Sequence, residues 1–259
     1  MGRCLLRSER FIVIHVLIPS YNCTPWIRRT LESVAKQTCA PTKVLVIDDA
    51  STDFEYEPLV TQLCEKFGYE YYRNRVNHKC PHNLRLGIDL LGPEADDVIF
   101  LLDGDDFLPH KKVFSRIVEV YENPDIWLTY GNYRPYPRNT GQHLAFAYPD
   151  QVIKERSFRT AAACFNHPIT FRKHLWDHVT DVDMQTSRGK WFTGGYDMVI
   201  MSAMLELATP HNGIDPHWRF LDETLYGYNA INPLSDAIIN VRLVEESREM
   251  MRRRKKNPL

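Results

Sequence analysis

Four short apolar segments in the first part of the chain predict buried β-strands. They are FIVIHVLI at 11–18, KVLVIDD at 43–49, YEYYRN at 69–74 and DVIFLLD at 97–103. β-Branched and aromatic residues are abundant in them, as is typical of strands. Because polar residues do not alternate regularly with apolar ones in the strongest of these segments, we expect strands that are covered on both faces, as in a parallel sheet.

Segments with a helical spacing of apolar residues separate these strands. In the first, Ile27, Leu31 and Val34 recur on one face of a helix. FEYEPLVTQLCEKFG at 54–68 and NLRLGIDLLG at 83–92 provide two more. The alternation of strands and helices predicts an α/β fold, with a Rossmann-like, mostly parallel central sheet and helices on both faces.

The later half of the chain has a looser pattern. We expect a helix over 109–122, a strand over 125–133 and a loop or short hairpin over 132–150, which is rich in proline. Residues 154–165 are expected to be helical, and YDMVIMSAMLELA at 196–208 predicts a strongly apolar helix in the core. No internal repeat or low-complexity linker divides the chain, so we expect a single domain.

Composition is that of an ordinary soluble globular protein. Of the 259 residues, 44% are hydrophobic and 25% are charged, and the net charge of −1 gives no global field that would attract nucleic acid. The six cysteines contain no CxxC pair, so a zinc site is not indicated, and they are best interpreted as thiols in a cytosol-like compartment, with disulfides left open. The apolar run at 11–18 is too short to span a membrane, and a strand is favoured over a signal peptide.

Polar residues gather where three of the predicted strands end. The first strand is followed by Pro19, Ser20, Tyr21 and Asn22, the second by Asp48 and Asp49, and the fourth by Asp103, Gly104, Asp105 and Asp106. In open α/β sheets, ligands bind beyond the carboxyl ends of the strands. We therefore expect these three clusters to form one composite site.

The acidic cluster indicates the kind of ligand by elimination. The sequence PSYNCTP after the first strand lacks the glycines of a dinucleotide site or a P-loop, and the acidic segment lacks the spacing of an EF-hand. Phe107 and Leu108 stand where an aspartate-nucleophile phosphatase would need a small hydroxyl residue. Carboxylates suit Mg²⁺ or Mn²⁺, and Mg²⁺ commonly completes its shell with phosphate oxygens. The site is therefore expected to bind a divalent cation together with a diphosphate.

At this point the motifs resemble those of the family 2 glycosyltransferases, which have the GT-A fold. VLIPSYN, KVLVIDDASTD, NRVNHKCPHNLRLGI and FLLDGDDFLPH follow one another in the family's order and cover roughly residues 12–135. The resemblance implies a nucleotide-sugar-binding half over 11–131 and an acceptor-binding half over 132–230. An N-terminal extension over 1–10 and a C-terminal helix with a basic tail over 231–259 would flank these halves.

The resemblance also implies roles for particular residues. The PSYN turn and Asp48 or Asp49 would face the base and ribose of a nucleotide-diphosphate sugar, with a UDP-sugar favoured over a GDP-sugar. Asp103 and Asp105 match the metal-binding DxD motif, with Asp103 also near the ribose. The residues implied in nucleotide-sugar binding are Pro19, Ser20, Tyr21, Asn22, Asp48, Asp49, Asn77, His82, Asn83, Asp103 and Gly104. His82 stands where the family usually has an arginine.

Family members invert the anomeric centre, which needs a general base on the hydroxyl of a glycan or other acceptor. Asp197, in GGYDMVIM, fits that position best, and its alternative role is to cap the apolar helix that follows. Asp106 has two interpretations: a third participant in the site, or the N-terminal charge of the next helix. His211 and His217 are weaker candidates for a late metal ligand.

Three classes of function remain open. An inverting, metal-dependent glycosyltransferase is the leading hypothesis. A sugar-nucleotide pyrophosphorylase would need a glycine-rich basic loop after the first strand, which PSYNCTP does not provide. A non-catalytic nucleotide-sugar-binding protein would not need the acidic turn or Asp197. The expected location is cytoplasmic, and the basic run MRRRKK at 251–256 allows peripheral membrane contact.

Overall fold

The computed structural model describes residues 11–137, 144–234 and 256–259. The strands are β1 (Ile14–Ser20), β2 (Lys43–Asp48), β3 (Glu70–Arg73), β4 (Val98–Leu101), β5 (Leu128–Tyr136), β6 (Ile169–Arg172) and β7 (Trp218–Asn229). The helices are α1 (Ile27–Ala35), α2 (Tyr56–Phe67), α3 (Cys80–Leu91), α4 (Val113–Tyr121), α5 (Asp150–Glu155), α6 (Lys173–Trp176) and α7 (Tyr196–Leu207), with a short 3₁₀ helix, η1 (Asp181–Met184).

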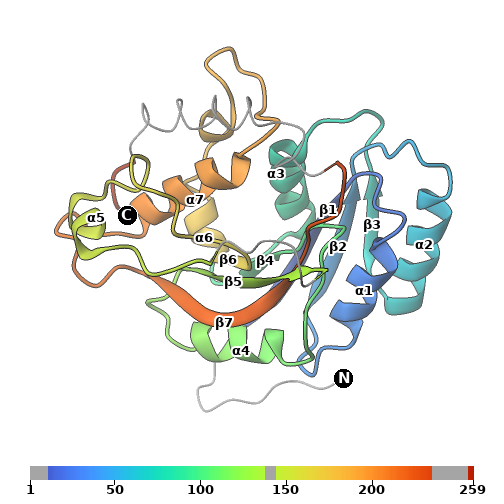
Figure 1. Ribbon diagram of the computed structural model, residues 1–259, viewed down its shortest axis with the longest axis horizontal. Helices are drawn as coiled ribbons and strands as arrows, with labels where there is room; N and C mark the ends of the chain where they lie inside the picture. The colour runs from blue at the N-terminus through green and yellow to red at the C-terminus, as the bar shows by residue number, and fades with distance from the viewer. Residues whose placement is uncertain (1–10, 138–143, 235–255) are drawn as a thin grey trace.

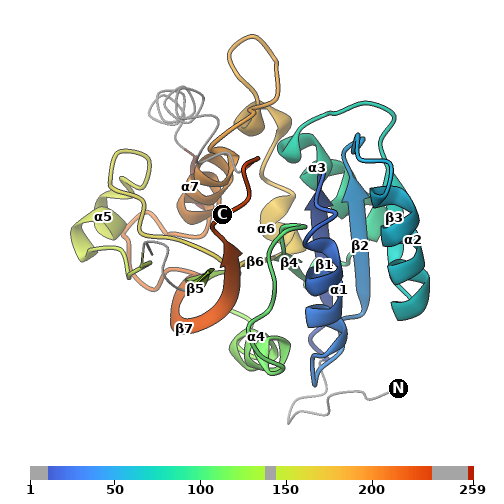
Figure 2. The ribbon, with the colours of Figure 1, turned by 45° about the vertical axis from the view of Figure 1, so that its right-hand side comes forward.

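All seven strands belong to one mixed, mostly parallel sheet in the order β3-β2-β1-β4-β6-β5-β7 (Figure 1). β6 runs antiparallel to both of its neighbours, β4 and β5, and every other pair is parallel. The carboxyl ends of β1, β2, β4, β5 and β7 therefore point toward the same edge of the sheet. A turned view shows β7 as a strongly curved strand alongside β5 (Figure 2).

Helices cover both faces of the sheet because successive strand residues point to opposite sides. Val16 and Ile18 of β1 belong to a core shared with α1, α2 and α4. Leu17, which lies between them, belongs to a second core shared with α3, α6 and α7. Gly87 lets α3 approach the sheet closely, since a Cβ at this position would lie 2.4 Å from a methyl group of Leu17. The structure confirms the predicted α/β class.

The predicted elements of the first half are present. β1 to β4 and α1 to α4 alternate as the hydrophobic pattern indicates, and α7 is the buried apolar helix expected over 196–208. Two expectations are wrong. β5 continues to Tyr136, so the residues after 131 begin as strand and not as loop. The helix expected over 154–165 ends at Glu155, because Arg156 adopts a left-handed conformation with φ of 52°.

Two strands, β6 and β7, had no counterpart in the hydrophobic pattern. β6 has only four residues, and β7 carries Asp222, Glu223 and Thr224 in its middle, where its pairing with β5 shifts register. The boundary between the two predicted halves falls inside β5, and one sheet contains strands from both. The division into halves stays a prediction, and the extension at 1–10 lies outside the described residues.

None of the helices in the described parts of the chain combines the length and the apolar character needed to cross a lipid bilayer.

Candidate active site

The loops that follow β1, β2 and β4 meet at the carboxyl edge of the sheet. The backbone amide of Asp49 donates to the Ser20 carbonyl at 2.8 Å, and that of Gly104 donates to the Pro19 carbonyl at 3.0 Å. Gly104 is needed at this junction, because a Cβ there would lie 2.5 Å from the Ser20 hydroxyl. The three polar clusters expected from the sequence therefore lie side by side.

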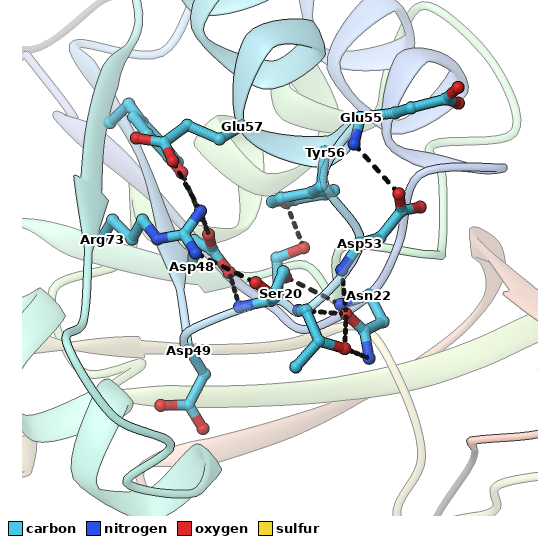
Figure 3. A network of polar contacts seen from close by, with 12 residues as sticks. Ser20, Asn22, Asp48, Asp49, Asp53, Glu55, Tyr56, Glu57 and Arg73 are labelled. Carbon is cyan, nitrogen blue, oxygen red and sulfur yellow. Dashed lines mark hydrogen bonds and ion pairs between the residues drawn. The ribbon is translucent and has the colours of Figure 1, made fainter.

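Asn22 ties the first loop to the second. Its side-chain oxygen accepts a hydrogen bond from the backbone amide of Thr52 at 2.8 Å, and its own backbone amide donates to the Ser51 hydroxyl at 2.9 Å (Figure 3). Asn22 has a left-handed conformation with φ of 52°, which asparagine tolerates better than most residues. Tyr21, next to it, is exposed at the rim of the site.

Asp48 is fully buried, and both oxygens of its carboxylate have partners within the protein. One oxygen accepts the Ser51 amide at 2.8 Å, and the other accepts the Tyr71 hydroxyl at 3.0 Å and lies 3.4 Å from the Arg73 guanidinium. Arg73 continues the network to Glu57 at 2.7 Å (Figure 3). These contacts stabilise the loop after β2, and the implied role of Asp48 toward the base or ribose stays a prediction.

Asp49 points away from this network (Figure 3) and organises the start of α3. Its carboxylate accepts the backbone amides of His78 at 2.8 Å and Lys79 at 2.9 Å, and the Asn74 carboxamide at 2.8 Å. Asn74 also donates to the Asn83 side chain at 2.6 Å. The buried Asp49 and Asn83 thus shape the segment 74–83, which carries the other residues expected to contact the nucleotide.

His82 and Asn77 lie on that segment with different surroundings. The His82 ring stacks on His78, with the ring centres 4.4 Å apart, and meets the edge of Trp191 at 5.5 Å. Asn77 donates to the backbone carbonyl of Asp49 at 3.2 Å. The expected Asn and His therefore reach the same edge, and Trp191 brings the loop before α7 to them.

The backbone of the acidic turn, residues 103–106, is held from two sides. From α1, the buried Thr30 hydroxyl donates to the Asp106 carbonyl at 2.6 Å. From β7, the Tyr226 hydroxyl accepts the Asp103 amide at 3.0 Å, and Gly227 pairs with Phe107 through two backbone hydrogen bonds of 2.7 and 3.0 Å. These hydrogen bonds from α1 and β7 hold the backbone at both ends of the turn.

The carboxylates of the turn have separate partners. Asp105 accepts the Asn232 carboxamide at 2.7 Å and lies 3.5 Å from that of Asn229. Burial raises the pKa of Asp105, and burial together with the negative charges of Asp105 and Asp103 raises the pKa of Asp106 well above its usual range. Sequence reasoning missed Asn229 and Asn232, which stand in the segment LYGYNAINP at 225–233.

Asp106 does not begin the following helix. It is 1% exposed and accepts the backbone amide of Asn229 at 2.7 Å, whereas α4 starts only at Val113. The helix-capping interpretation of Asp106 is therefore wrong. Its carboxylate fastens the acidic turn to the end of β7.

The acidic turn fits a divalent cation. Asp103 and Asp105 are partly exposed on either side of Gly104, and they offer the hard oxygen ligands that Mg²⁺ and Mn²⁺ prefer. No group of three or more histidine, cysteine, aspartate or glutamate side chains is placed to hold a metal within the described ranges. A cation here would therefore take its remaining ligands from water or from the oxygens of a bound diphosphate.

α7 brings the second half of the chain to this edge. Asp197 lies in the first turn of α7 and is partly exposed. Burial raises the pKa of the neighbouring Tyr196 well above its usual range, and the charges of Asp103 and Asp197 add to this rise. Asp197 thus lies at a helix N-terminus, and its role as the general base stays a prediction.

His211 and His217 lie elsewhere. His217 precedes β7 at the amino edge of the sheet, where its ring stacks on Trp127 at 3.8 Å. Asn229, which contacts the acidic turn, is at the other end of that strand. His211 is exposed in a turn after α7. Among the described residues no group of three or more metal-binding side chains includes either histidine, and the hypothesis of a late histidine ligand stays a prediction.

Only the end of the predicted basic tail is described. Lys256 forms an ion pair with Asp183 at 2.7 Å, and its backbone amide donates to Glu206 at 2.7 Å. Leu259 donates a backbone hydrogen bond to the Leu207 carbonyl at 3.0 Å. The last residues of the chain are therefore attached to the end of α7, and the rest of the basic run lies outside the described residues.

Comparison with known proteins shows the family to which this chain belongs. The family model described as glycosyl transferase family 2 matches residues 15–177, well over half of the chain. The chain therefore belongs to glycosyltransferase family 2. This membership favours a transferase over the pyrophosphorylase and the non-catalytic binding protein that the sequence had left open.

Curated relatives agree with this assignment. An uncharacterized glycosyltransferase of Haemophilus influenzae is 28% identical over 149 residues, which is 57% of this chain and 47% of the relative. Glycosyltransferase GlyG of Streptococcus pneumoniae is 27% identical over 134 residues, covering 50% of this chain and 42% of GlyG. The chain thus spans less than half the length of these relatives.

Solved structures share the GT-A fold. The mannosyltransferase PcManGT of Pyrobaculum calidifontis, solved with GDP-Man and Mn²⁺, has a TM-score of 0.64 at 17% identity, covering 95% of this chain and 65% of its own. Residues 1–349 of S. aureus TarS, solved with UDP-GlcNAc, give a TM-score of 0.58 at 18% identity, covering 85% of this chain and 59% of theirs.

Proposed function

We propose that this protein is an inverting, metal-dependent glycosyltransferase that moves a sugar from a nucleotide-diphosphate sugar to a hydroxyl of a glycan or other acceptor. The observation that carries the proposal is the carboxyl edge of the sheet. There, the acidic turn meets the loops after β1 and β2 in a chain of family 2, and Trp191, in the loop before α7, meets the ring of His82. We infer that the acidic turn binds the diphosphate and that α7 supplies the candidate base.

For the donor, we propose that the base and ribose lie against the PSYN turn and the loops shaped by Asp49. Tyr21 is exposed there, and Asn77, His82 and Gly104 border the same edge. Asp48 would act indirectly, since its carboxylate holds the loop. We expect UDP-sugars to bind better than GDP-sugars; TarS is known with UDP-GlcNAc and PcManGT with GDP-Man, so the family-like fold accommodates either base.

For the cation, we propose Mn²⁺ or Mg²⁺ held by Asp103 and Asp105. Bound there, a divalent cation would offset the negative charge that develops on the leaving diphosphate. The neighbours PcManGT and GalNAc-T7 are known with Mn²⁺, which supports the choice of metal. The hydrogen bond from Asn232 fixes the Asp105 carboxylate at the surface of the turn, so little reorganisation is needed.

For the acceptor, we propose that Asp197 removes the proton of the attacking hydroxyl. The hydroxyl oxygen then forms the new glycosidic bond on the face opposite the leaving diphosphate, which inverts the anomeric carbon. The position of Asp197 in the first turn of α7, with Trp191 of the preceding loop against His82, supports this role. A carboxylate serves as a base only within hydrogen-bond reach of the proton, and the partly exposed side chain leaves that approach open.

Calorimetry with a panel of UDP- and GDP-sugars tests the donor and the metal. We expect binding with Mn²⁺ or Mg²⁺ and a large loss of affinity in EDTA. Asp105→Asn should reproduce the EDTA result, while Asp89→Asn, on the exposed part of α3, should bind like the parent. Equal binding with and without metal would rule out the metal role, and binding of no nucleotide-sugar would contradict the proposed donor class.

Replacement of the candidate base separates binding from chemistry. Asp197→Asn should bind the donor like the parent and lose transfer by at least about 100-fold, the usual contribution of a general base. Asp150→Asn is the matched control, since Asp150 also lies in the first turn of a helix but is exposed on α5. If Asp197→Asn retained transfer, Asp197 would be a helix-terminal charge only.

We further propose a cytoplasmic location, with peripheral contact to anionic membranes through the basic run at 251–256. Sedimentation with vesicles of anionic and of neutral lipid tests the contact. Binding to anionic vesicles that disappears at high salt is expected, because polybasic segments bind through screened charge. Binding to neither vesicle would remove the membrane contact.

A further inference from the structure

Arg29 reaches the acidic turn from α1. Its guanidinium donates a hydrogen bond from Nη2 to the backbone carbonyl of Asp105 at 3.0 Å. Arg29 is partly buried, and no ion pair joins it to the carboxylates of Asp105 or Asp106 within the described part of the chain. The Arg29 guanidinium thus binds the main chain of Asp105, although two carboxylates are close to it. The side chain of Asp105 is left to other partners.

Two aromatic rings hold the guanidinium in this place. The Arg29 Cζ atom lies 4.3 Å from the centre of the Phe107 ring and 4.5 Å from that of Tyr136. Such contacts with a desolvated cation are attractive and favour the planar guanidinium over an ammonium. Phe107 is itself fixed by its pairing with Gly227, where a Cβ would collide with the ring at 2.5 Å. The rings therefore determine where the Arg29 donors point.

The carboxylate of Asp105 receives only neutral donors from the described residues around it. Asn232 donates at 2.7 Å and Asn229 lies at 3.5 Å. A direct, bidentate pair with Arg29 would have occupied this carboxylate, since such pairs are among the strongest in proteins. The aromatic rings and the carbonyl contact keep Arg29 from forming one.

We propose that Arg29 is a positioning residue, which fixes the main chain of Asp105 from α1 so that its carboxylate stays available to a divalent cation. This inference rests on the proposed function of the acidic turn. Arg29 would touch neither substrate nor metal. Its effect would pass through the hydrogen bond to the Asp105 carbonyl, which outweighs the repulsion between its positive charge and a bound divalent cation.

Four variants test this role in the full-length protein. Arg29→Met removes the hydrogen-bond donor and the positive charge. Arg29→Lys keeps the charge but lacks the planar guanidinium that packs against the two aromatic rings. Tyr136→Leu keeps Arg29 and removes one ring; Tyr136 is 47% exposed, so folding should survive the change. Arg28→Met, at an exposed position of the same helix, is the matched control.

Two measurements are needed. The first is calorimetric titration with MnCl₂ alone, where Arg29→Met should weaken binding about tenfold, the equivalent of one lost charge-assisted hydrogen bond. Arg29→Lys and Tyr136→Leu should fall between that variant and the parent, and Arg28→Met should match the parent. The second is amide hydrogen exchange of residues 103–107 without metal, which should become faster in the same order.

The outcomes separate this inference from the proposed function. A parent protein that binds no Mn²⁺ would contradict the proposed metal site, while the exchange rates would still show whether Arg29 fixes the turn. Arg29→Met with parent-like Mn²⁺ affinity, or with unchanged exchange at 103–107, would overturn the inference. If Arg29→Met does not fold, Arg29→Lys and Tyr136→Leu decide by the same two criteria.

Discussion

The backbone amide of Asn229 donates a hydrogen bond to Oδ1 of Asp106 at 2.7 Å, although the two residues are 123 positions apart in the chain. Asp106 is almost completely buried, and its pKa is raised by burial and by the neighbouring carboxylates. The contact gives the buried carboxylate a structural role, because it is the acceptor that joins the end of β7 to the acidic turn.

Two substitutions of Asp106 should have different effects on stability. Asp106→Ala leaves the buried Asn229 amide without its acceptor, and we expect the free energy of unfolding to fall by about 1–3 kcal/mol. Asp106→Asn keeps an acceptor and cannot ionise in a buried place that disfavours the carboxylate, so its stability should equal or exceed that of the parent. Urea unfolding near neutral pH measures both, and equal stability of the two variants would contradict this account.

A carboxylate in place of Asn232 should make stability depend on metal. The Asn232 carboxamide donates to Asp105 at 2.7 Å, so Asn232→Asp would set two carboxylates against each other. We expect a lower melting temperature without metal and recovery of at least part of the loss in MnCl₂. Asn232→Ala removes the same hydrogen bond without adding charge and is the control. If Mn²⁺ stabilised both variants equally, the repulsion would not be the cause.

Lys79 has a backbone conformation that favours glycine. It stands before α3 with φ of 75° and ψ of 158°, and its amide donates to Asp49 at 2.9 Å. Lys79→Gly should raise the free energy of unfolding by about 1 kcal/mol, because the strain of a side chain in this region exceeds the extra entropy of glycine in the unfolded chain. Lys79→Ala, which retains Cβ, should give no such gain. Denaturant unfolding that gave the two variants equal stability would contradict the strain.

His167 should make the protein less stable in mild acid. Its ring stacks on Tyr226 with centres 4.7 Å apart, and burial lowers its pKa from 6.5 to about 4. Between those pKa values the unfolded chain binds more protons than the folded one. The free energy of unfolding therefore rises with pH across this window, and the stability is lost as the pH falls from 6.5 toward 4.

The contribution of His167 is measurable by comparing urea unfolding at about pH 5 and about pH 7.5. His167→Gln should reduce the difference in stability between the two conditions by on the order of 1 kcal/mol. His211→Gln, at an exposed position, should leave the difference unchanged. An unchanged pH dependence in His167→Gln would mean that the histidine is not held neutral by the fold.

The sequence was most informative where burial and chain direction act together. Continuous apolar runs predicted β1, β2 and β4, and the polar residues just after them had to meet, because parallel strands end at one edge. β6 and β7 were not predicted from the sequence pattern. A four-residue strand leaves no period to detect, and the register shifts in β7 interrupt its alternation of apolar and polar residues.

The sequence by itself determined the α/β alternation, the edge of the sheet at which the polar residues gather, and the pair Asp103 and Asp105 on that edge. Only the tertiary structure decided which hydrogen-bond partners each carboxylate has. Asp48 accepts hydrogen bonds from Ser51 and Tyr71, and Asp106 accepts one from Asn229. Asp105 accepts one from Asn232, and Arg29 donates to its backbone carbonyl. The physical reason is that residue type and spacing determine which polar side chains lie at the carboxyl edge of the sheet. Residues from distant parts of the chain determine which of these side chains already have hydrogen-bond partners.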